Sequence, residues 1–150
     1  MKRVHGVFEI DDDRQRIDFA AVHQWLAQTY WSPGAKREDV ERGAQHSSLV
    51  VGAYLDGKQV GFLRVISDRY RFAYVADVFV DAEQRGRGVG RAMLQFAIEH
   101  PEHQGLNCWL LATHDAHGVY RAVGFEPLHE PDRWMQYRPL LDHVDVHALT

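Results

Sequence analysis

The chain has 150 residues, with 17 lysines and arginines against 21 aspartates and glutamates and a formal net charge of −4. This length suits one domain, residues 1–150, and the charge balance argues against a strongly basic nucleic-acid binder. The single cysteine, Cys108, leaves no intramolecular disulfide and fits a reducing compartment. No apolar run is long enough for a signal peptide or a membrane span. We therefore expect a cytoplasmic protein with neither a membrane nor a nucleic-acid partner.

The first half of the chain predicts one strand, two helices and a hairpin. Asp18 is placed to cap a helix, because apolar residues recur at helical spacing after it. Asp56-Gly57 separates two β-rich runs and is a strong hairpin signal. The expected strands are residues 7–10, 49–55 and 59–66, and the expected helices are residues 19–31 and 36–46, with Val40 and Ala44 of the second helix facing inward.

The second half predicts strands that alternate with helices. A strand at 72–80 leads through a glycine-rich loop into a helix that His100-Pro101 ends, and Asp115 caps a short helix that Gly124 ends. The remaining strands are residues 107–112, 125–128 and 134–140, and residues 141–150 form a loose tail. Hairpins followed by strand–helix–strand units indicate an α+β fold, with a mixed, mostly antiparallel sheet of about seven strands flanked by four helices.

The glycine-rich loop at residues 84–91 is the strongest functional signal. Such a loop, between a strand and a helix, exposes backbone N–H groups beside the positive end of the helix dipole, where they attract phosphate. Its glycines let an anion approach the main chain, and Arg85, Arg87 and Arg91 add positive charge. The loop predicts a pyrophosphate site, with a glycine-rich turn that binds nothing as the alternative.

Three phosphate-binding patterns compete for this loop. It lacks the spacing and the Lys-Ser or Lys-Thr of a Walker A loop, and Arg91 stands where the dinucleotide fingerprint has its third glycine. Arg85, Gly88 and Gly90 match Arg-x-x-Gly-x-Gly, which resembles motif A of the GNAT superfamily, the acyl-CoA-dependent N-acetyltransferases. The run from Ala116 to Phe125, Ala-x-x-Val-Tyr-x-x-x-Gly-Phe, is similar to a second GNAT motif. Together the motifs extend the resemblance over residues 5–140.

The resemblance implies a binding site for acetyl-CoA (coenzyme A). Backbone groups of Val78 and Val80 would pair with the pantetheine arm where two parallel strands splay apart, and the amides of residues 86–91 would bind the pyrophosphate. Thr113 stands where the family often has an asparagine, and its hydroxyl offers fewer contacts. The residues that the resemblance assigns to the cofactor are Val78, Phe79, Val80, Arg85, Gly86, Arg87, Gly88, Val89, Gly90, Arg91, Thr113 and Tyr120.

Two side chains are candidates for catalysis. The resemblance gives Tyr120 the role of general acid, and a phenol with a pKa of about 10 can protonate a leaving thiolate. Its alternative role is an aromatic anchor for the last helix. Asp77 is the candidate general base, although it can equally cap backbone groups, and solvent can deprotonate the amine without it. Many relatives carry a glutamate on the strand after motif A, but residues 107–112 contain no acid.

Tyr30 and Trp31 lie in the segment that, by resemblance, walls the acceptor site. Two aromatic rings there can hold a flat or cationic acceptor, or simply fill the core end of the first helix. Trp109 and Trp134 are interpreted as core residues and Cys108 as a buried small hydrophobe. Ten histidines are scattered without a matched ligand cluster, so we expect no metal site. His114, at a strand end, is instead a candidate for proton transfer.

The sequence thus predicts an acetyl-CoA-dependent N-acetyltransferase. An amine, on a small molecule or a peptide, would attack the thioester directly. The alternatives are a non-catalytic acyl-CoA-binding module of the same fold and a nucleotide-binding regulatory domain. Relatives commonly dimerise through their C-terminal strands, so the resemblance also allows a homodimer.

Overall fold

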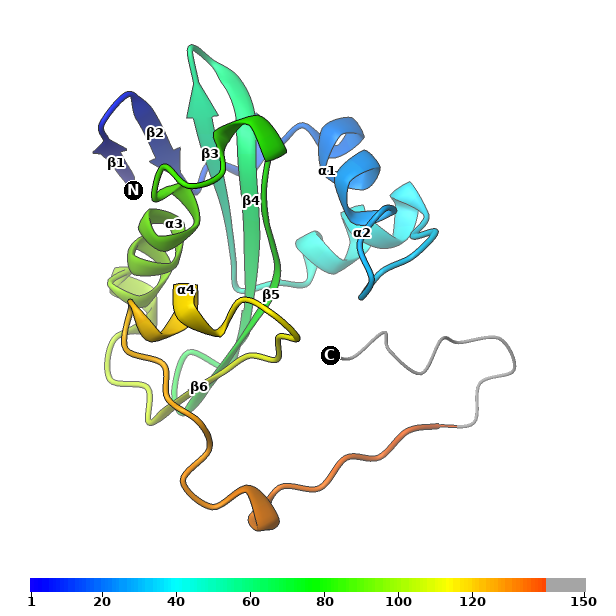
Figure 1. Ribbon diagram of the computed structural model, residues 1–150, viewed down its shortest axis with the longest axis vertical. Helices are drawn as coiled ribbons and strands as arrows, with labels where there is room; N and C mark the ends of the chain where they lie inside the picture. The colour runs from blue at the N-terminus through cyan, green and yellow to red at the C-terminus, as the bar shows by residue number, and fades with distance from the viewer. Residues whose placement is uncertain (140–150) are drawn as a thin grey trace.

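The computed structural model describes residues 1–139, which form a mixed six-stranded sheet with four helices (Figure 1). The strands are β1 (Lys2–His5), β2 (Phe8–Asp11), β3 (Leu49–Leu55), β4 (Lys58–Ser67), β5 (Phe72–Val80) and β6 (Cys108–Leu110). The helices are α1 (Phe19–Leu26), α2 (Arg37–Gln45), α3 (Val89–Ile98) and α4 (His117–Arg121). The strands lie in chain order, and only β5 and β6 are parallel. This is the predicted α+β class.

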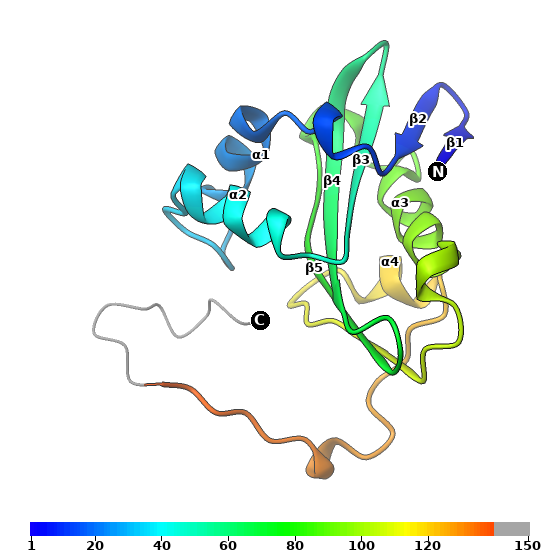
Figure 2. The same ribbon diagram turned by 180° about the vertical axis from the view of Figure 1, so that it is seen from behind.

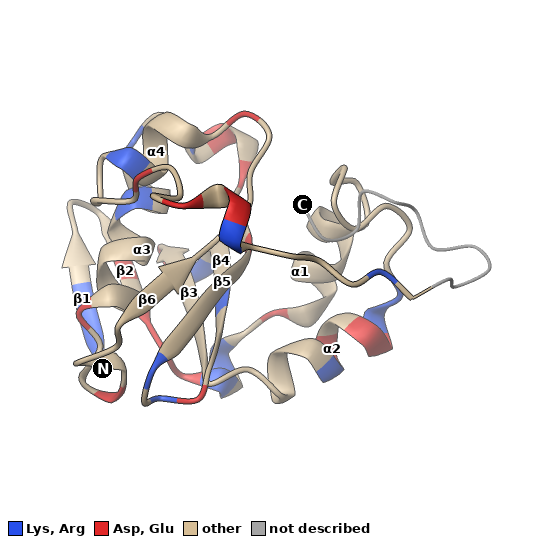
Figure 3. Ribbon diagram, turned by 90° about the horizontal axis from the view of Figure 1, so that it is seen from below, with Lys and Arg blue, Asp and Glu red and all other residues tan. Residues whose placement is uncertain are grey.

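Helices cover both faces of the sheet. Figures 1 and 2 place α3 on one face and α1 with α2 on the other, and Figure 3 shows the same layers from below, with acidic and basic residues interspersed along α2. α3 packs across β2, β3, β4 and β5, whereas α1 reaches β5. Two helical layers explain why the central strands are apolar on both faces.

The core follows the alternation of side chains along the central strands. On β3, Val51 joins the larger cluster under α3, and its neighbour Val50 joins the smaller cluster under α1 and α2. On β4, Leu63 and Phe62 divide in the same way. Each large apolar side chain buried in this way contributes about 1.5–3 kcal/mol. The sheet therefore separates two core clusters, each of which is covered by its own helices.

Three local signals in the first half of the chain are confirmed. Asp56 and Gly57, with φ of 49° and 81°, form the turn between β3 and β4. Both values are positive, as a type I′ hairpin turn requires. The carboxylate of Asp18 accepts a hydrogen bond from the Ala21 N–H and caps α1. On α2, Ala44 is buried.

Several predicted boundaries are wrong. The first helix ends at Leu26 instead of continuing to residue 31, and β6 has three residues where six were expected. The predicted Asp115 cap is also wrong, because the hydroxyl of Thr113 accepts the Ala116 N–H at 3.1 Å. α4 itself ends at Arg121, and Gly124, with φ of 101°, ends the turn that follows the helix.

The sequence analysis missed one strand and predicted two others wrongly. β1 was missed because its four residues are exposed and show no apolar alternation. The segments 125–128 and 134–139 are not strands, and residue 140 lies outside the described residues, as does the predicted tail. Trp134 is 48% exposed, so its assignment to the core is wrong. Residues with a high β propensity form a strand only where a neighbouring strand is present to pair with them.

The segment after α4 runs away from the sheet as an extended chain (Figure 1). Trp109, in contrast, packs against the larger core cluster as predicted. Among residues 1–139, no helix is long and apolar enough to cross a membrane.

Candidate functional site

A cleft of about 1170 Å³ opens beside the C-terminal half of β5. Its lining comes from the end of α1, from β5, from the glycine-rich loop and from the β6–α4 segment. Of the site residues predicted from the sequence, all but Arg87 and His114 line this cleft. Segments far apart in the chain therefore meet at one cavity, which is large enough for an extended ligand.

The two parallel strands separate at this cleft. β5 and β6 pair only through Phe72–Cys108, Ala73–Trp109 and Tyr74–Leu110. Residues 75–80 of β5 continue beyond the last pair, and no described strand borders them on that side. Their backbone groups face the cleft as an open sheet edge, which is suited to pairing with an extended ligand.

A β-bulge interrupts the other edge of β5. The ladder pairs Phe62 with Phe79 and Arg64 with Ala76, so Asp77 and Val78 together oppose the single residue Leu63. Val78 packs toward the core under α3, whereas the Asp77 carboxylate points toward the α1–α2 side. The bulge therefore places an apolar and an acidic side chain on opposite faces at one point of the strand.

The glycine-rich loop joins β5 to α3 with two residues in the left-handed region. Gly86 and Gly88 have φ of 77° and 79°, and Gly88 is the N-cap of α3. The first N–H groups of α3 have no partner within the helix, and the dipole makes that end positive. A Cβ on Gly90 would lie 3.6 Å from Cγ2 of Val80, so helix and strand approach closely here. We call residues 78–91 the glycine wall.

The three arginines of the glycine wall are disposed differently. Arg85 donates from Nε to the carbonyl of Val80 and lies 5.3 Å from the centroid of Phe79. Arg87 lies over Phe8 and bonds Gln84, so its side chain is turned away from the cleft. Arg91 lines the cleft, is exposed, and has no hydrogen bond or ion pair to any described residue. Arg91 is therefore the arginine best placed to meet an anion.

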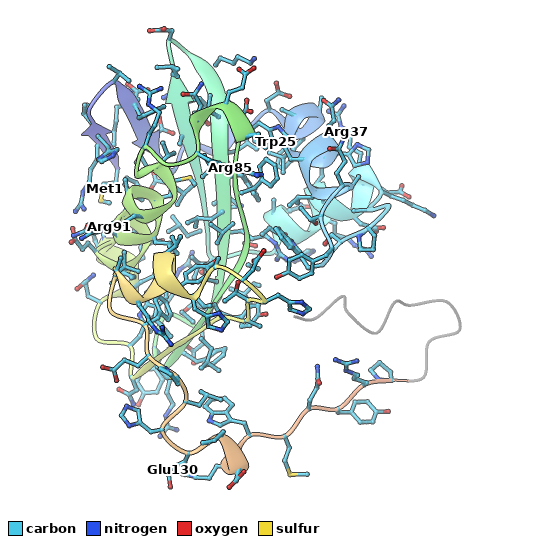
Figure 4. All side chains as sticks on the ribbon, in the orientation of Figure 1. Met1, Trp25, Arg37, Arg85, Arg91 and Glu130 are labelled. Carbon is cyan, nitrogen blue, oxygen red and sulfur yellow. The ribbon has the colours of Figure 1, made fainter. Side chains whose placement is uncertain are left out.

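The opposite side of the cleft is built from aromatic rings. Trp25 stacks on Phe79 with centroids 5.2 Å apart, and Figure 4 shows Trp25 and Arg85 approaching one another beside that strand. Tyr30 and Trp31 meet edge to face at 4.9 Å. We call Trp25, Tyr30 and Trp31, together with Arg64 and Asp77, the aromatic wall.

Polar contacts tie the aromatic wall to the sheet. Trp31 Nε1 donates to Oδ1 of Asp77 at 3.1 Å, and Arg64 Nε donates to Oδ2 at 2.6 Å. The hydroxyl of Tyr30 accepts the backbone N–H of His114 at 3.1 Å, and the two rings lie 4.5 Å apart. His114 thus serves to hold Tyr30, and its predicted role in proton transfer remains untested.

Tyr120 stands between the two walls. It is half-buried on α4, meets Phe125 edge to face, and makes no hydrogen bond to any described residue. Burial, followed by the nearby Tyr30 and Asp115, raises the pKa of Tyr120 to about 12. The phenol is therefore protonated at neutral pH and can act only as a proton donor.

Thr113 and Cys108 differ from their predicted settings. Thr113 lines the cleft, and its hydroxyl oxygen accepts the Ala116 N–H at the start of α4, which occupies one of its lone pairs. Cys108 is half-buried instead of buried and borders a second cleft along β6. Within residues 1–139, no three His, Cys, Asp or Glu side chains gather as a metal site.

Arg64 and His5 are residues of this region that the sequence analysis missed. Arg64 had a detectable signal, because a lone cation inside the apolar run of residues 60–66 needs a buried counter-ion. His5 donates from Nε2 to the carbonyl of Arg87 at 3.1 Å and lies against Gly88. Nothing in the sequence signals that contact, because it joins segments more than eighty residues apart.

The split parallel pair, the bulged strand and the glycine-rich helix start define an α+β protein with a cleft at an open sheet edge, beside the N-terminus of α3. The model of the acetyltransferase (GNAT) family matches residues 9–125, and the chain belongs to this family. Membership supports acyl transfer as its general chemistry.

Solved structures agree with this assignment. A GNAT-family structure from Xanthomonas campestris pv. campestris is 41% identical, with a TM-score of 0.83 over 88% of this chain and 93% of that one. A GNAT-family acetyltransferase from Brucella melitensis, in complex with acetyl-CoA, shares the fold at 19% identity, with a TM-score of 0.64 over 82% of this chain and 85% of that one.

Curated relatives match over part of their length. Serotonin N-acetyltransferase 2 of Oryza sativa subsp. japonica is 29% identical over 73% of this chain and 56% of its own. Glucosamine 6-phosphate N-acetyltransferase 1 of the same plant is 32% identical over 55% of this chain and 54% of its own. The chain thus spans about half the length of the curated relatives it matches.

Proposed function

We propose that the protein is an N-acetyltransferase that moves the acetyl group of acetyl-CoA to a primary amine. The observation that carries the proposal is the open edge of β5, residues 75–80, which runs directly into the glycine-capped start of α3. An extended amide-containing arm suits the edge, and a pyrophosphate suits the helix start. The acetyl-CoA complex of the Brucella melitensis relative supports the same choice of substrate.

The residues that would hold acetyl-CoA divide by chemistry. Backbone groups of Val78 and Val80 would form hydrogen bonds with the pantetheine arm. The Arg85 side chain, which now donates to the Val80 carbonyl, would release that carbonyl when the arm binds. The amides of residues 86–91 and the guanidinium of Arg91 serve the pyrophosphate. Thr113 offers one further polar contact at the cleft.

The transfer needs a nucleophilic amine, a polarised carbonyl and a protonated leaving group. The neutral amine forms a bond to the thioester carbon, and the N–H at Val78 stabilises the oxyanion that develops in the tetrahedral intermediate. When the C–S bond breaks, Tyr120 gives its proton to the thiolate, and the proton lost by the amine ends in solvent. No covalent intermediate with the enzyme is required.

The acceptor is proposed to bind against Tyr30 and Trp31, which present ring faces and edges to the cleft. Such a wall favours a flat or cationic amine. The relatives named for serotonin and for glucosamine 6-phosphate represent an aromatic and an amino-sugar acceptor, so both belong in a substrate panel together with a polyamine and a lysine peptide.

The test is calorimetric titration with acetyl-CoA, followed by measurement of free-thiol release with the amine panel. Micromolar binding and amine-dependent thiol release support the transferase. Binding without turnover of any amine supports the alternative, a non-catalytic acyl-CoA-binding module. Tight binding of ATP or NAD that coenzyme A does not displace supports the nucleotide-binding regulatory domain.

We also propose that the protein acts as a cytoplasmic homodimer. The cytoplasmic location rests on the single cysteine, Cys108, and fluorescence microscopy of a tagged chain tests it. The dimer rests on the C-terminal side of the sheet, where a cleft of about 750 Å³ runs along β6 and large side chains such as Met135 are exposed. Light scattering of the purified protein distinguishes one copy from two.

A further inference from the structure

Asp77 has an unusual backbone. Its φ of 56° lies in the left-handed region, which few residues with side chains adopt and which aspartate tolerates better than most. This conformation coincides with the bulge where Asp77 and Val78 oppose Leu63. The strand thereby turns its one acid toward the aromatic wall, so the geometry of the bulge fixes where the carboxylate points.

Both oxygens of this carboxylate are already engaged. Oδ2 accepts from Arg64 Nε at 2.6 Å and Oδ1 accepts from Trp31 Nε1 at 3.1 Å. The Asp77 and Arg64 side chains are only 14% and 22% exposed, so solvent screens the pair weakly. A carboxylate in this position would lose its ion pair with Arg64 if it took a proton from a substrate.

Arg64 is itself held from the other side. Its Nη1 donates to the hydroxyl of Ser47 at 3.4 Å, and its guanidinium lies against Gly43 of α2, where a Cβ would be 3.5 Å from Cζ. Arg64, which lies on β4 and contacts α2, therefore holds the Asp77 carboxylate in a fixed position. The acid is a link in a chain of contacts that runs from α2 to Trp31.

Trp31 lies at the end of that chain. Its indole N–H bonds Asp77, its ring packs against the smaller core cluster, and its edge meets Tyr30, which the His114 backbone N–H holds from the β6–α4 segment. The connection between α1 and α2 is thus fixed to β5 and to the β6–α4 segment. Trp31 has one hydrogen-bond donor, and Asp77 is its partner.

We infer that Asp77 is a positioning residue: through Trp31 Nε1 it holds the acceptor side of the cleft in place, and it does not serve as the base that deprotonates the amine. This inference rests on the proposed transferase function and deepens it, because it names the device that shapes the acceptor site. The proton of the amine then leaves through solvent.

An indole N–H resonance tests the hydrogen bond without any need for activity. In a nitrogen–proton correlation spectrum, the Trp31 indole signal is assigned by its loss in Trp31→Phe. In Asp77→Ala and Asp77→Asn, this signal should move toward that of an exposed indole, and its exchange with water should accelerate about tenfold, as expected for a lost bond to a charged acceptor. Asp115→Asn is the matched control, since Asp115 lines the same cleft without a hydrogen bond or ion pair to described residues.

Kinetics separate positioning from base catalysis. If Asp77 positions Trp31, Asp77→Asn and Trp31→Phe raise the KM of the acceptor to a similar extent, leave kcat within about threefold, and keep the pH profile of kcat/KM unchanged in shape. If Asp77 is the base, Asp77→Asn lowers kcat by roughly 10²–10⁴ and removes a limb of the profile, while Trp31→Phe retains kcat. The second pattern, or an unmoved indole signal in both Asp77 variants, overturns the inference.

The outcome is separable from that of the proposed function. A wild-type protein that fails to bind acetyl-CoA defeats the transferase, while the indole spectrum still reports whether Asp77 holds Trp31. A protein that binds acetyl-CoA and turns over an amine, yet shows an unchanged Trp31 signal in Asp77→Asn and Asp77→Ala, keeps the transferase and defeats the positioning role.

Discussion

The two walls of the cleft are built by different means. The glycine wall is made of backbone: an open strand edge, two residues with positive φ and the free N–H groups of a helix start. The aromatic wall is made of side chains from α1, the α1–α2 connection, β4 and β5 that hold each other by single contacts such as Trp31 to Asp77 and Arg64 to Asp77. A wall made of backbone presents N–H and C=O groups whatever the sequence. A wall made of side chains presents groups that change when the sequence changes. For the proposed transferase, this difference suits acetyl-CoA, the same in every reaction, to the glycine wall and the acceptor amine to the aromatic wall.

The largest expected effect comes from Tyr120, which belongs to neither wall. Tyr120→Phe removes the proposed proton donor but keeps the ring that meets Phe125. We expect kcat to fall roughly 10²–10⁴-fold, with the Kd of acetyl-CoA and the KM of the acceptor little changed. Thiol-release kinetics and calorimetry check this.

The pH dependence offers a second view of the same residue. A phenol whose pKa is raised to about 12 keeps its proton at every lower pH, so Tyr120 should produce no fall in kcat between pH 8 and pH 10. In the opposite case, a loss of kcat near pH 10 that disappears in Tyr120→Phe, the phenol would be titrating at its ordinary value. A kcat of Tyr120→Phe equal to that of wild type would remove the tyrosine from catalysis.

The next largest effect is expected from a substitution in the glycine wall that changes the binding of acetyl-CoA alone. Gly90 has a helical backbone, and an added Cβ would make only an ordinary contact with Val80. Gly90→Asp therefore places a negative charge where a pyrophosphate is expected, and an acid in the first turn favours the helix. We expect the Kd of acetyl-CoA to rise roughly 100-fold through like-charge repulsion, measured by calorimetry.

Gly90→Asn is the control of matched size for this substitution. Its Kd should rise far less than that of Gly90→Asp, and both variants should melt at or above the wild-type temperature. Equal losses in the two variants would show that bulk, not charge, is excluded, and the glycine wall would then no longer be an anion site.

A smaller effect is expected on the aromatic wall. Tyr30→Phe keeps the ring beside Trp31 but removes the hydroxyl that accepts the His114 N–H. Losing one hydrogen bond of about 1 kcal/mol should raise the KM of the acceptor about fivefold and leave the Kd of acetyl-CoA unchanged. Tyr70→Phe is the control, because Tyr70 is 79% exposed and distant from the cleft lining. A weakened affinity for acetyl-CoA in Tyr30→Phe would mean that the two walls are not independent.

The same difference explains what the sequence could predict. The glycine wall depends on local rules, since residues 84–91 carry their own φ requirements and begin a helix, and Asp56-Gly57 specifies its own turn. The aromatic wall depends on pairs distant in the chain, such as Trp31 with Asp77, which a single sequence does not reveal. The strands expected at residues 125–128 and, within the described part of the chain, at 134–139 are absent for a related reason, because a strand needs a partner that its own residues do not supply. Arg64 is an intermediate case. Its charge within an apolar run predicts that a counter-ion is present, but the sequence does not show that this counter-ion is Asp77.

Substitution of His5 should have the smallest effect on the affinity for acetyl-CoA. It tests most directly whether the glycine wall forms without side-chain contacts from distant segments. His5 is the one side chain from a distant segment that bonds the backbone of the glycine wall, through Nε2 to the carbonyl of Arg87, among the described residues. If backbone rules alone shape the glycine wall, His5→Ala should raise the Kd of acetyl-CoA by about two- to threefold, as for a single exposed hydrogen bond. Calorimetric titration with acetyl-CoA measures this change.

Val4→Ala controls for the loss of a side chain from β1, since Val4 is 75% exposed on the same strand. Affinity in this variant should equal that of wild type. A loss beyond about tenfold in His5→Ala alone exceeds what one exposed hydrogen bond can supply. It would mean that Gly86 and Gly88 hold their positive φ only with support from the N-terminal hairpin. The glycine wall would then depend on a long-range side-chain contact, as the aromatic wall does, and local sequence rules would not be sufficient to make it.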